Sequence, residues 1–445
     1  MRDLTFIAAM ICGLLPMTAA RPFVGVLLWC WVSFMNPHEL TWGMSMNLPW
    51  AYMIFFTTLF GCVVAREPKR FPLNATTILI MLFIVLISLT SLAALAPPDM
   101  VESKWSFVAK SFLAQLLVGA LLTERRRIHA LIWVMVISLG YFGIRGGVFT
   151  LMNGGNYRVL GPPMTMINDN NHLAAALLVC MPLMNYLRLQ SRHRIIRIGL
   201  IGAMVLTLFS ALGSYSRGAL IGLAAMSLFL WWNSPHKIVS AAVAVVALAG
   251  AISFMPASWT ARMSTINSYQ KDDSAEGRLN IWHASWKIAL ARPLTGGGFM
   301  APYRQSIVDE YDPGTTARAV HSIYFEVIGE HGFPTFFVWL GITFAGIVNT
   351  WRIIRATRKV PELRWCYDFA KMAQVSIIAY LVAGAFLSLC YWDFYFTLLI
   401  GIMATWERVK DALRAAEPAR ATTLAARRLR LTTTGAAGAL PAPPG

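Results

Sequence analysis

Residues that could do chemistry gather in one polar stretch, Ser264 to Ala319, inside a chain that is otherwise almost continuously apolar. The stretch is rich in arginine, tryptophan and acidic residues, and it leads into His321, where the next apolar run begins. Connections between packed elements are usually short, so a polar connection of this length and composition is expected to carry function. The sequence therefore predicts chemistry at a membrane surface, with His321 beside it.

His321 is the residue best suited to move a proton. Its imidazole titrates near neutral pH, so it can take a proton from a hydroxyl group or return one. Glu326 follows five residues later and is a candidate for binding substrate, although this spacing need not place it on the same helix face. The alternative interpretation of His321 is an ordinary histidine at the membrane interface.

Three arginines could form an anion site at the same membrane face. Arg145 and Arg217 each lie beside glycine, which lets a bulky ligand approach the backbone, and Arg278 begins an amphipathic helical pattern. A guanidinium group offers two parallel donors to phosphate, so we expect Arg217 and Arg278 to take part in catalysis and Arg145 to bind substrate. Each arginine alone could instead anchor its helix at the interface.

Further candidates for substrate binding are aromatic or amide residues. Trp282 and Trp286 lie four apart on one helix face, where they could stack on sugar rings or belong to an interfacial aromatic belt. The run from Asn168 through Asn171 to His172 either caps the helix that follows or binds carbohydrate hydroxyls.

Several other kinds of site are not expected. The glycine triplet after Pro293 is not followed by the Gly-Lys-Ser/Thr of a phosphate loop. No His/Asp grouping suggests a metal, and the six cysteines have neither metal-binding nor disulfide spacing. No pair of carboxylates flanks an obvious site as in most glycosidases. We therefore expect neither a metal nor another cofactor.

Composition predicts an all-α polytopic membrane protein. Hydrophobic residues make up 57% of the 445 residues and charged residues 13%, with a mean hydropathy of +0.57. A bilayer-spanning helix needs about 20 mostly apolar residues, and in lipid its backbone groups must be satisfied within the helix. The start of the chain has no A-x-A cleavage pattern, so no removable signal peptide is expected.

The net charge of +17 is distributed in a way that argues against a nucleic-acid partner. The basic residues cluster in short connections and in the tail, which is the positive-inside pattern of cytoplasmic loops. Anionic membrane lipids are the expected neighbours of these clusters, which lie near residues 66–70, 125–127, 188–197, 352–364 and 408–430.

About twelve transmembrane helices are expected from these patterns. They fall within 1–255 and 320–408, and they enclose a large non-cytoplasmic loop at 256–319. Residues 409–445 are expected to be a cytoplasmic tail, disordered from about Ala415 onwards. The spans are placed near 49–65, 76–95, 105–123, 128–150, 171–188, 195–214, 217–233, 237–255, 334–354, 370–391 and 393–407, with one or two more in 5–36.

The sequence resembles the O-antigen ligases and their Wzy-C superfamily. His321-Ser322, then nine residues, then Gly332-Phe333-Pro334-Thr335 fits a ligase motif, and Arg217 with Leu220 resembles a looser outer-loop motif. The block from Gly277 to Phe299 resembles the Wzy-C region. The resemblance runs from about Arg145 to Trp392.

The resemblance implies a metal-independent, inverting membrane glycosyltransferase of the GT-C type in the bacterial inner membrane. Its donor would be a glycan on undecaprenyl pyrophosphate at the periplasmic face, and its acceptor a sugar hydroxyl of lipid A–core, completing lipopolysaccharide. His321 would deprotonate the acceptor or hydrogen-bond the pyrophosphate, while Arg217 and Arg278 would stabilise the leaving group.

Three alternatives stay open. An O-antigen polymerase would share the donor but extend another lipid-linked glycan, and a protein O-oligosaccharyltransferase would need an acceptor protein. A lipid-linked glycan transporter would form no covalent product. It would be expected to carry ionisable residues in mid-membrane and two repeated halves, whereas the charges recognised here gather at one face.

Overall fold

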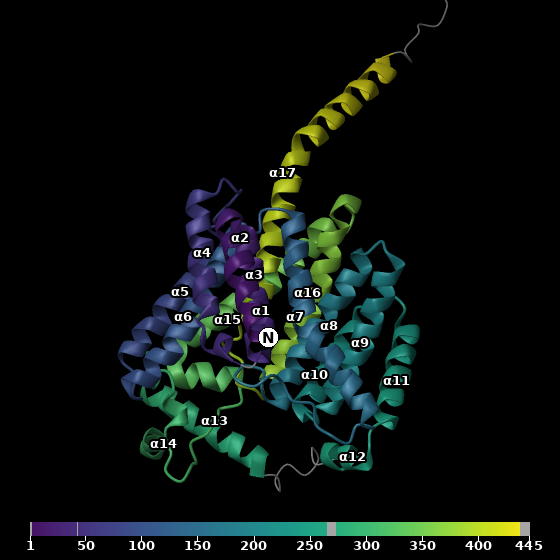
Figure 1. The fold of residues 1–445 in the computed structure, drawn as a ribbon. Helices are drawn as coiled ribbons and strands as arrows, with labels where there is room; N and C mark the ends of the chain where they lie inside the picture. The colour runs from purple at the N-terminus through teal and green to yellow at the C-terminus, as the bar shows by residue number, and fades with distance from the viewer. Residues whose placement is uncertain (1, 42, 265–272, 437–445) are drawn as a thin grey trace, which may run out of the picture.

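The computed structural model describes residues 2–41, 43–264 and 273–436, and in these ranges the regular structure is helical throughout. Figure 1 shows the helices gathered into one bundle. In chain order the longer helices are α1 (Arg2–Ala8), α2 (Leu15–Ala20), α3 (Pro22–Met35), α4 (Trp50–Val64), α5 (Ala75–Leu92), α6 (Pro98–Leu121), α7 (Arg125–Met152), α8 (Asn170–Gln190), α9 (Arg194–Gly213), α10 (Arg217–Trp232), α11 (Lys237–Ser253), α12 (Ala257–Ser264), α13 (Asp273–Ala291), α14 (Gln305–Tyr311), α15 (Ile323–Thr357), α16 (Arg364–Gly384) and α17 (Asp393–Ala436). Short π or 3₁₀ turns lie at η1 (Ala9–Leu14), η2 (Pro37–Leu40), η3 (Met44–Asn47), η5 (Ala301–Tyr303) and η6 (Pro361–Leu363).

The helical membrane class predicted from composition is confirmed. Among the described residues, six helical stretches are long and apolar enough to cross a membrane, or seven if the pair α11 and α12, bent by 115°, forms one span. Helices α3, α4 and α10 are apolar but shorter. Each segment predicted as a span is largely helical, although 385–391 of the predicted span 370–391 are turns and bends beyond the end of α16. The total of about twelve spans and the GT-C architecture stay predictions.

Large apolar side chains cover much of the outer surface, as expected where helices meet lipid tails rather than water. On α9 the exposed residues include Ile195, Ile198 and Val205, and on α11 they include Val243 and Val246. An aqueous protein would bury such continuous apolar faces. The exposed faces of α9 and α11 therefore fit a bilayer.

Small residues bring α7 and α9 into close contact. A Cβ atom added to Gly147 would lie 2.1 Å from the carbonyl oxygen of Leu206, and one added to Gly143 would lie 2.4 Å from the hydroxyl of Thr207. Small residues allow membrane helices to approach until their backbones touch, where dispersion replaces the hydrophobic driving force. This contact holds the α7–α9 pair beside the helix α8.

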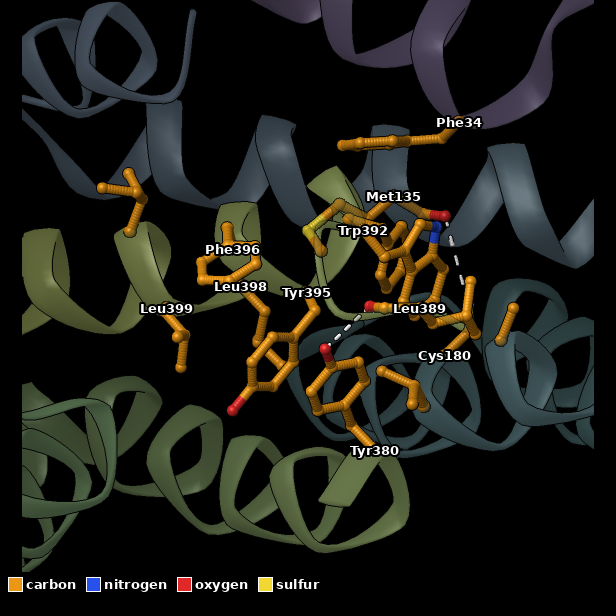
Figure 2. Close-up of a cluster of buried hydrophobic side chains, with 14 of the residues drawn as sticks. Phe34, Met135, Cys180, Tyr380, Leu389, Trp392, Tyr395, Phe396, Leu398 and Leu399 are labelled. Atoms are coloured by element: carbon orange, nitrogen blue, oxygen red, sulfur yellow. Dashed lines mark hydrogen bonds between the residues drawn. The ribbon is translucent and has the colours of Figure 1, made fainter. Parts of the chain in front are cut away.

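The helix α8 is almost wholly buried, and it packs against α16. The hydroxyl of Ser376 on α16 donates to the carbonyl oxygen of Val179 at 2.7 Å, which ties the two helices together inside the bundle. Beside this contact, the start of α17 supplies a stacked aromatic core. The rings of Tyr380 and Tyr395 lie 3.6 Å apart, and the hydroxyl of Tyr380 donates to the Leu389 carbonyl oxygen (Figure 2).

The helix α15 is broken at Gly332, whose φ of 72° lies in the left-handed region. A neighbouring turn takes over the backbone bonds that the helix would otherwise make. The amides of Gly297 and Gly298 donate to the carbonyl oxygens of Gly329 and Glu330 at 2.9 and 2.7 Å. Pro334 has no N–H with which to close the helix across this point. The glycine triplet 296–298 thus binds α15 through its backbone amides, and we call this contact the backbone clasp.

The two ends of the bundle differ. Helices α12, α13 and α14 lie across one end, and the long α17 projects from the other (Figure 1). Ion pairs at the α17 end join Arg70 to Asp411 at 3.0 Å and Arg127 to Glu67 at 3.1 Å. The end of the bundle with these ion pairs and the end covered by α12, α13 and α14 are therefore opposite each other.

The tail differs from expectation. Where disorder was predicted beyond about Ala415, the structure continues α17 as helix to Ala436. Alanine, leucine and arginine have high helix propensity, and this part of the sequence is rich in them. The last part of the predicted tail, 437–445, lies outside the described residues.

Candidate functional site

His321 lies just before α15, at the end of the bundle that carries α12–α14. Its backbone is in the left-handed region, with a φ of 49°, and its amide donates to the hydroxyl of Ser388 at 2.9 Å. A left-handed conformation costs energy in a residue other than glycine and needs support from its surroundings. The Nδ1 atom of His321 is buried and has no hydrogen-bond partner. This nitrogen is therefore free of competing protein contacts.

A second histidine faces His321 from the start of α8. The ring of His172 lies 5.9 Å from that of His321, measured between centroids. Asp169 caps α8 by accepting from the amides of Asn171 and His172 at 2.7 and 3.3 Å, and its carboxylate also lies 3.2 Å from Nδ1 of His172. The Asn/Asp run is thus a helix cap, and it also fixes the orientation of the His172 ring.

These capping contacts affect the carboxyl group. Burial alone would raise the pKa of Asp169, but the hydrogen bonds from His172 and Asn171 outweigh burial and hold it well below its usual range. Asp169 is therefore ionised at neutral pH.

The environment keeps the imidazole of His321 neutral. Burial, then the positive charge of Arg278, then His172 lower the pKa of His321 to about 4, whereas the negative charge of Asp169 opposes the shift. Below that pH the ring gains a proton, and above it the ring is a neutral base. At neutral pH His321 can therefore accept a proton through its unpartnered nitrogen.

Helix α13 brings Arg278 and Trp282 to this segment. The indole Nε1 of Trp282 donates to the carbonyl oxygen of Val320 at 2.7 Å, and its ring stacks on Phe325 at 5.3 Å. Arg278 lies one turn earlier on the same helix, and its charge reaches His321. Trp282 was predicted to bind substrate or join an aromatic belt, but its contacts tie α13 to the chain around His321.

Arg217 enters from the neighbouring α10, of which it is the first residue. The turn before it is held to α8, because the side-chain amide of Asn170 donates to the carbonyl oxygen of Ser214 at 2.6 Å. The Ser216 hydroxyl caps α10 by accepting from the Ala219 amide at 3.2 Å. The start of α10 is thus fixed beside the start of α8, which carries His172.

The other predicted residues are placed differently. Arg145 lies on the exposed face of α7, and Asn168 is exposed beside the α8 cap. The side chain of Asn171 donates to that of Asn170 at 3.2 Å. The structure therefore brings together His321, His172 and Arg278, with Arg217 on an adjacent helix start, and leaves Arg145 as a prediction.

A buried charge cluster, unpredicted from sequence, lies beside this site. The ammonium group of Lys104 on α6 lies 3.0 Å from the Glu326 carboxylate and 2.8 Å from that of Glu330 on α15. The hydroxyls of Tyr303 and Tyr391 donate to these carboxylates, both at 2.8 Å. We call Lys104, Glu326, Glu330, Tyr303 and Tyr391 the lysine–glutamate cluster.

Glu326 was predicted to bind substrate, yet its side chain is only 3% exposed and is held by Lys104 and Tyr303. Its Oε2 atom has no partner. Lys104 and Glu330 were not among the residues predicted to form a site. Glu326 and Glu330 are four residues apart on one face of an apolar helix, and that spacing was the available signal.

Within the described ranges, no group of three or more His, Cys, Asp and Glu side chains is arranged to hold a metal ion. The site consists instead of a neutral imidazole, nearby arginines and hydroxyl or amide groups. This set can accept a proton and hold an anion.

Comparison with known families gives two matches. Residues 202–340 match the family described as O-antigen ligase, and residues 1–192 match a family of unknown function. A search of curated proteins gave no match. The ligase region contains α10 and α13, which carry Arg217 and Arg278, and the segment just before α15, which carries His321.

Proposed function

Because the chain belongs to the O-antigen ligase/Wzy-C superfamily, we propose that it is a membrane glycosyltransferase that acts as an O-antigen ligase. Its proposed donor is a glycan on undecaprenyl pyrophosphate, and its proposed acceptor is a sugar hydroxyl of lipid A–core. The reaction takes place on the periplasmic face of the inner membrane and inverts the anomeric carbon. The positive-inside pattern supports this orientation, with the C-terminus in the cytoplasm.

The observation that carries the proposal is the state of His321. A buried imidazole with an unpartnered nitrogen and a pKa near 4 is neutral and able to accept a proton. It lies beside Arg278, so the proton acceptor and an anion-binding group share one end of the bundle.

The proposed transfer is a single displacement. The acceptor hydroxyl gives its proton to His321 as its oxygen bonds to the anomeric carbon of the donor. The bond between that carbon and the pyrophosphate oxygen breaks, and its electron pair leaves with undecaprenyl pyrophosphate. A positioned base typically contributes 10²–10⁴-fold to such a step.

The arginines would act on the leaving group. Arg278 and Arg217 would hold the pyrophosphate and stabilise the charge that grows on it in the transition state, where preorganised donors are most effective. Bound pyrophosphate would also offset the charge of Arg278, which lowers the pKa of His321 in the free protein. Donor binding would therefore make His321 a stronger base.

The test uses purified protein, a lipid-linked O-antigen donor and lipid A–core, with EDTA present and no added metal. Growth of the acceptor with the wild-type protein, but not with His321→Ala, is the expected result. Lengthening of the donor glycan would instead indicate a polymerase. Transfer only to an added protein would indicate a protein O-oligosaccharyltransferase. Counterflow of lipid-linked glycan without a covalent product would indicate a transporter and refute the enzyme.

A further inference from the structure

A cavity of about 290 Å³ opens beside the site, between the C-terminal end of α3, the helix α6, the α7–α8 connection and the start of α17. It is close to the lower end of the range for small-ligand sites, which is about 300 Å³. A cavity of this size can hold only a small part of a glycan.

The lining of the cavity combines aromatic rings with a buried carboxylate. Phe107 is exposed and supplies an aromatic ring, the nearly buried Phe34 and Trp392 complete the aromatic part of the lining, and Ser33 and Asp393 supply polar groups. Figure 2 shows Phe34 and Trp392 arriving from different parts of the chain. The apolar face of a sugar ring packs on aromatic rings, while its hydroxyls need polar partners.

Asp393 is the polar centre of the cavity. It is only 8% exposed, and it accepts hydrogen bonds from the Ser33 hydroxyl and, at 2.8 Å, from the Phe394 amide. Among the described residues no ion pair to Asp393 is formed. A carboxylate oxygen has more than one acceptor site, so each oxygen can still accept from a ligand hydroxyl.

Two walls of the cavity continue to His321. The segment 164–167 runs on into the α8 cap and His172, whose ring lies 5.9 Å from that of His321. Trp392 follows Ser388 by four residues, and the Ser388 hydroxyl accepts from the His321 amide at 2.9 Å. A ligand in the cavity would therefore sit against chain segments that hold the proton acceptor.

We propose that this cavity is a sugar-binding subsite, in which Asp393 accepts from ring hydroxyls and the side chain of Phe107 packs on the ring. The inference rests on the proposed glycosyl transfer. The sugar belongs either to the acceptor or to the donor glycan, because both present the same chemistry. Part of the subsite comes from the region 1–192, beyond the ligase-family match.

The test is a set of three variants in the full-length protein. Asp393→Asn keeps the shape of the side chain and removes its charge. Phe107→Ala removes an aromatic side chain that is 55% exposed, and Phe344→Ala, at 65% exposed on α15 away from the cavity lining, is the matched control. Purification yield and elution profile establish folding.

Separate titrations of lipid A–core and of the lipid-linked donor identify which sugar is bound. We expect Asp393→Asn to raise the KM for one of the two substrates by roughly 10-fold, as for a lost hydrogen bond to a charged group. Phe107→Ala should raise the same KM, and Phe344→Ala should raise neither. Unchanged KM values for both substrates in the folded Asp393 and Phe107 variants would overturn the subsite.

Binding of the lipid-free core oligosaccharide and of the lipid-free O-antigen glycan is measured separately by equilibrium dialysis. Weaker binding of either glycan to Asp393→Asn than to the wild-type protein supports the subsite even if no transfer occurs. Equal binding, or no binding to the wild-type protein, would refute it. Loss of transfer chemistry and loss of the subsite are thus distinguishable.

Discussion

Replacing Lys104 with methionine removes the cation that two buried carboxylates share. Glu326 and Glu330 are 3% and 0% exposed, and the ammonium group lies 3.0 and 2.8 Å from them. Removing one partner of a buried ion pair leaves an uncompensated charge and typically costs about 3–5 kcal/mol. The tyrosine hydroxyls remain in place, so we expect Lys104→Met to lower stability by about 3 kcal/mol, the lower end of that range.

The assay is thermal unfolding in one fixed detergent, followed by the fraction that stays monodisperse. Lys110→Met is the matched control, because Lys110 lies on the same helix but contacts the Ser106 hydroxyl and the Tyr52 ring. We expect Lys104→Met to unfold several degrees below both the wild-type protein and this control. Lowering the pH should narrow the gap, because protonation of the carboxyl groups removes the unpaired charge.

A double variant tests the reasoning directly. Lys104→Met with Glu330→Gln removes one cation and one carboxylate charge together, so its loss should be smaller than the sum of the two single losses. If Lys104→Met is as stable as the wild-type protein, Lys104 does not stabilise the two carboxylates. If the losses of stability in the two single variants add strictly in the double variant, Lys104 and Glu330 are not energetically coupled.

Three further outcomes concern the transfer reaction. Arg217→Ala and Arg278→Ala should each nearly abolish transfer at unchanged protein abundance. Arg217→Lys should restore only part of the activity, because lysine lacks the planar guanidinium group that offers two parallel donors. A wild-type transfer rate in either alanine variant would remove the substituted arginine from the mechanism. Protonation of His321 should make kcat/KM fall as pH drops through about 4, and a fall already centred near pH 6.5 would contradict its environment. Trp282→Phe should keep the stacking but lose the bond to the Val320 carbonyl, lowering kcat by roughly 3–10-fold with little change in either KM.

Much of the helix pattern could be predicted from the sequence, because apolar run length and the positions of basic connections are local signals. The start of α8 follows from the Asn/Asp run before His172, and Asp169 caps it as such runs do. Gly332 and Pro334 indicate in the sequence that α15 is broken there. The cause of the break, the backbone clasp from the glycine triplet, required the tertiary structure.

The candidate site was only partly predictable, because contacts between distant segments leave no local signal in the sequence. His321 and Arg278 stand out because polar groups beside apolar spans are unusual. The pairing of Lys104 with Glu330 joins residues 226 apart in sequence, and no local pattern says which helices are neighbours. Trp282 was predicted to bind substrate or to belong to an aromatic belt, but a sequence cannot show whether a tryptophan ring is open to a sugar or already stacked on another residue, as Trp282 is on Phe325.

The tight packing of α8 on α16 has a consequence for how the chain could be divided. The region 1–192 ends just after α8, yet α8 is buried against a helix some 180 residues further on, with Gln190 donating to Asp368 at 2.9 Å. Neither piece could cover its own core. We expect fragments 1–192 and 193–445, produced from separate genes, to be degraded alone but to assemble into a co-purifying pair when made together. Accumulation of either fragment alone as a monodisperse species would show that the two regions are independent units.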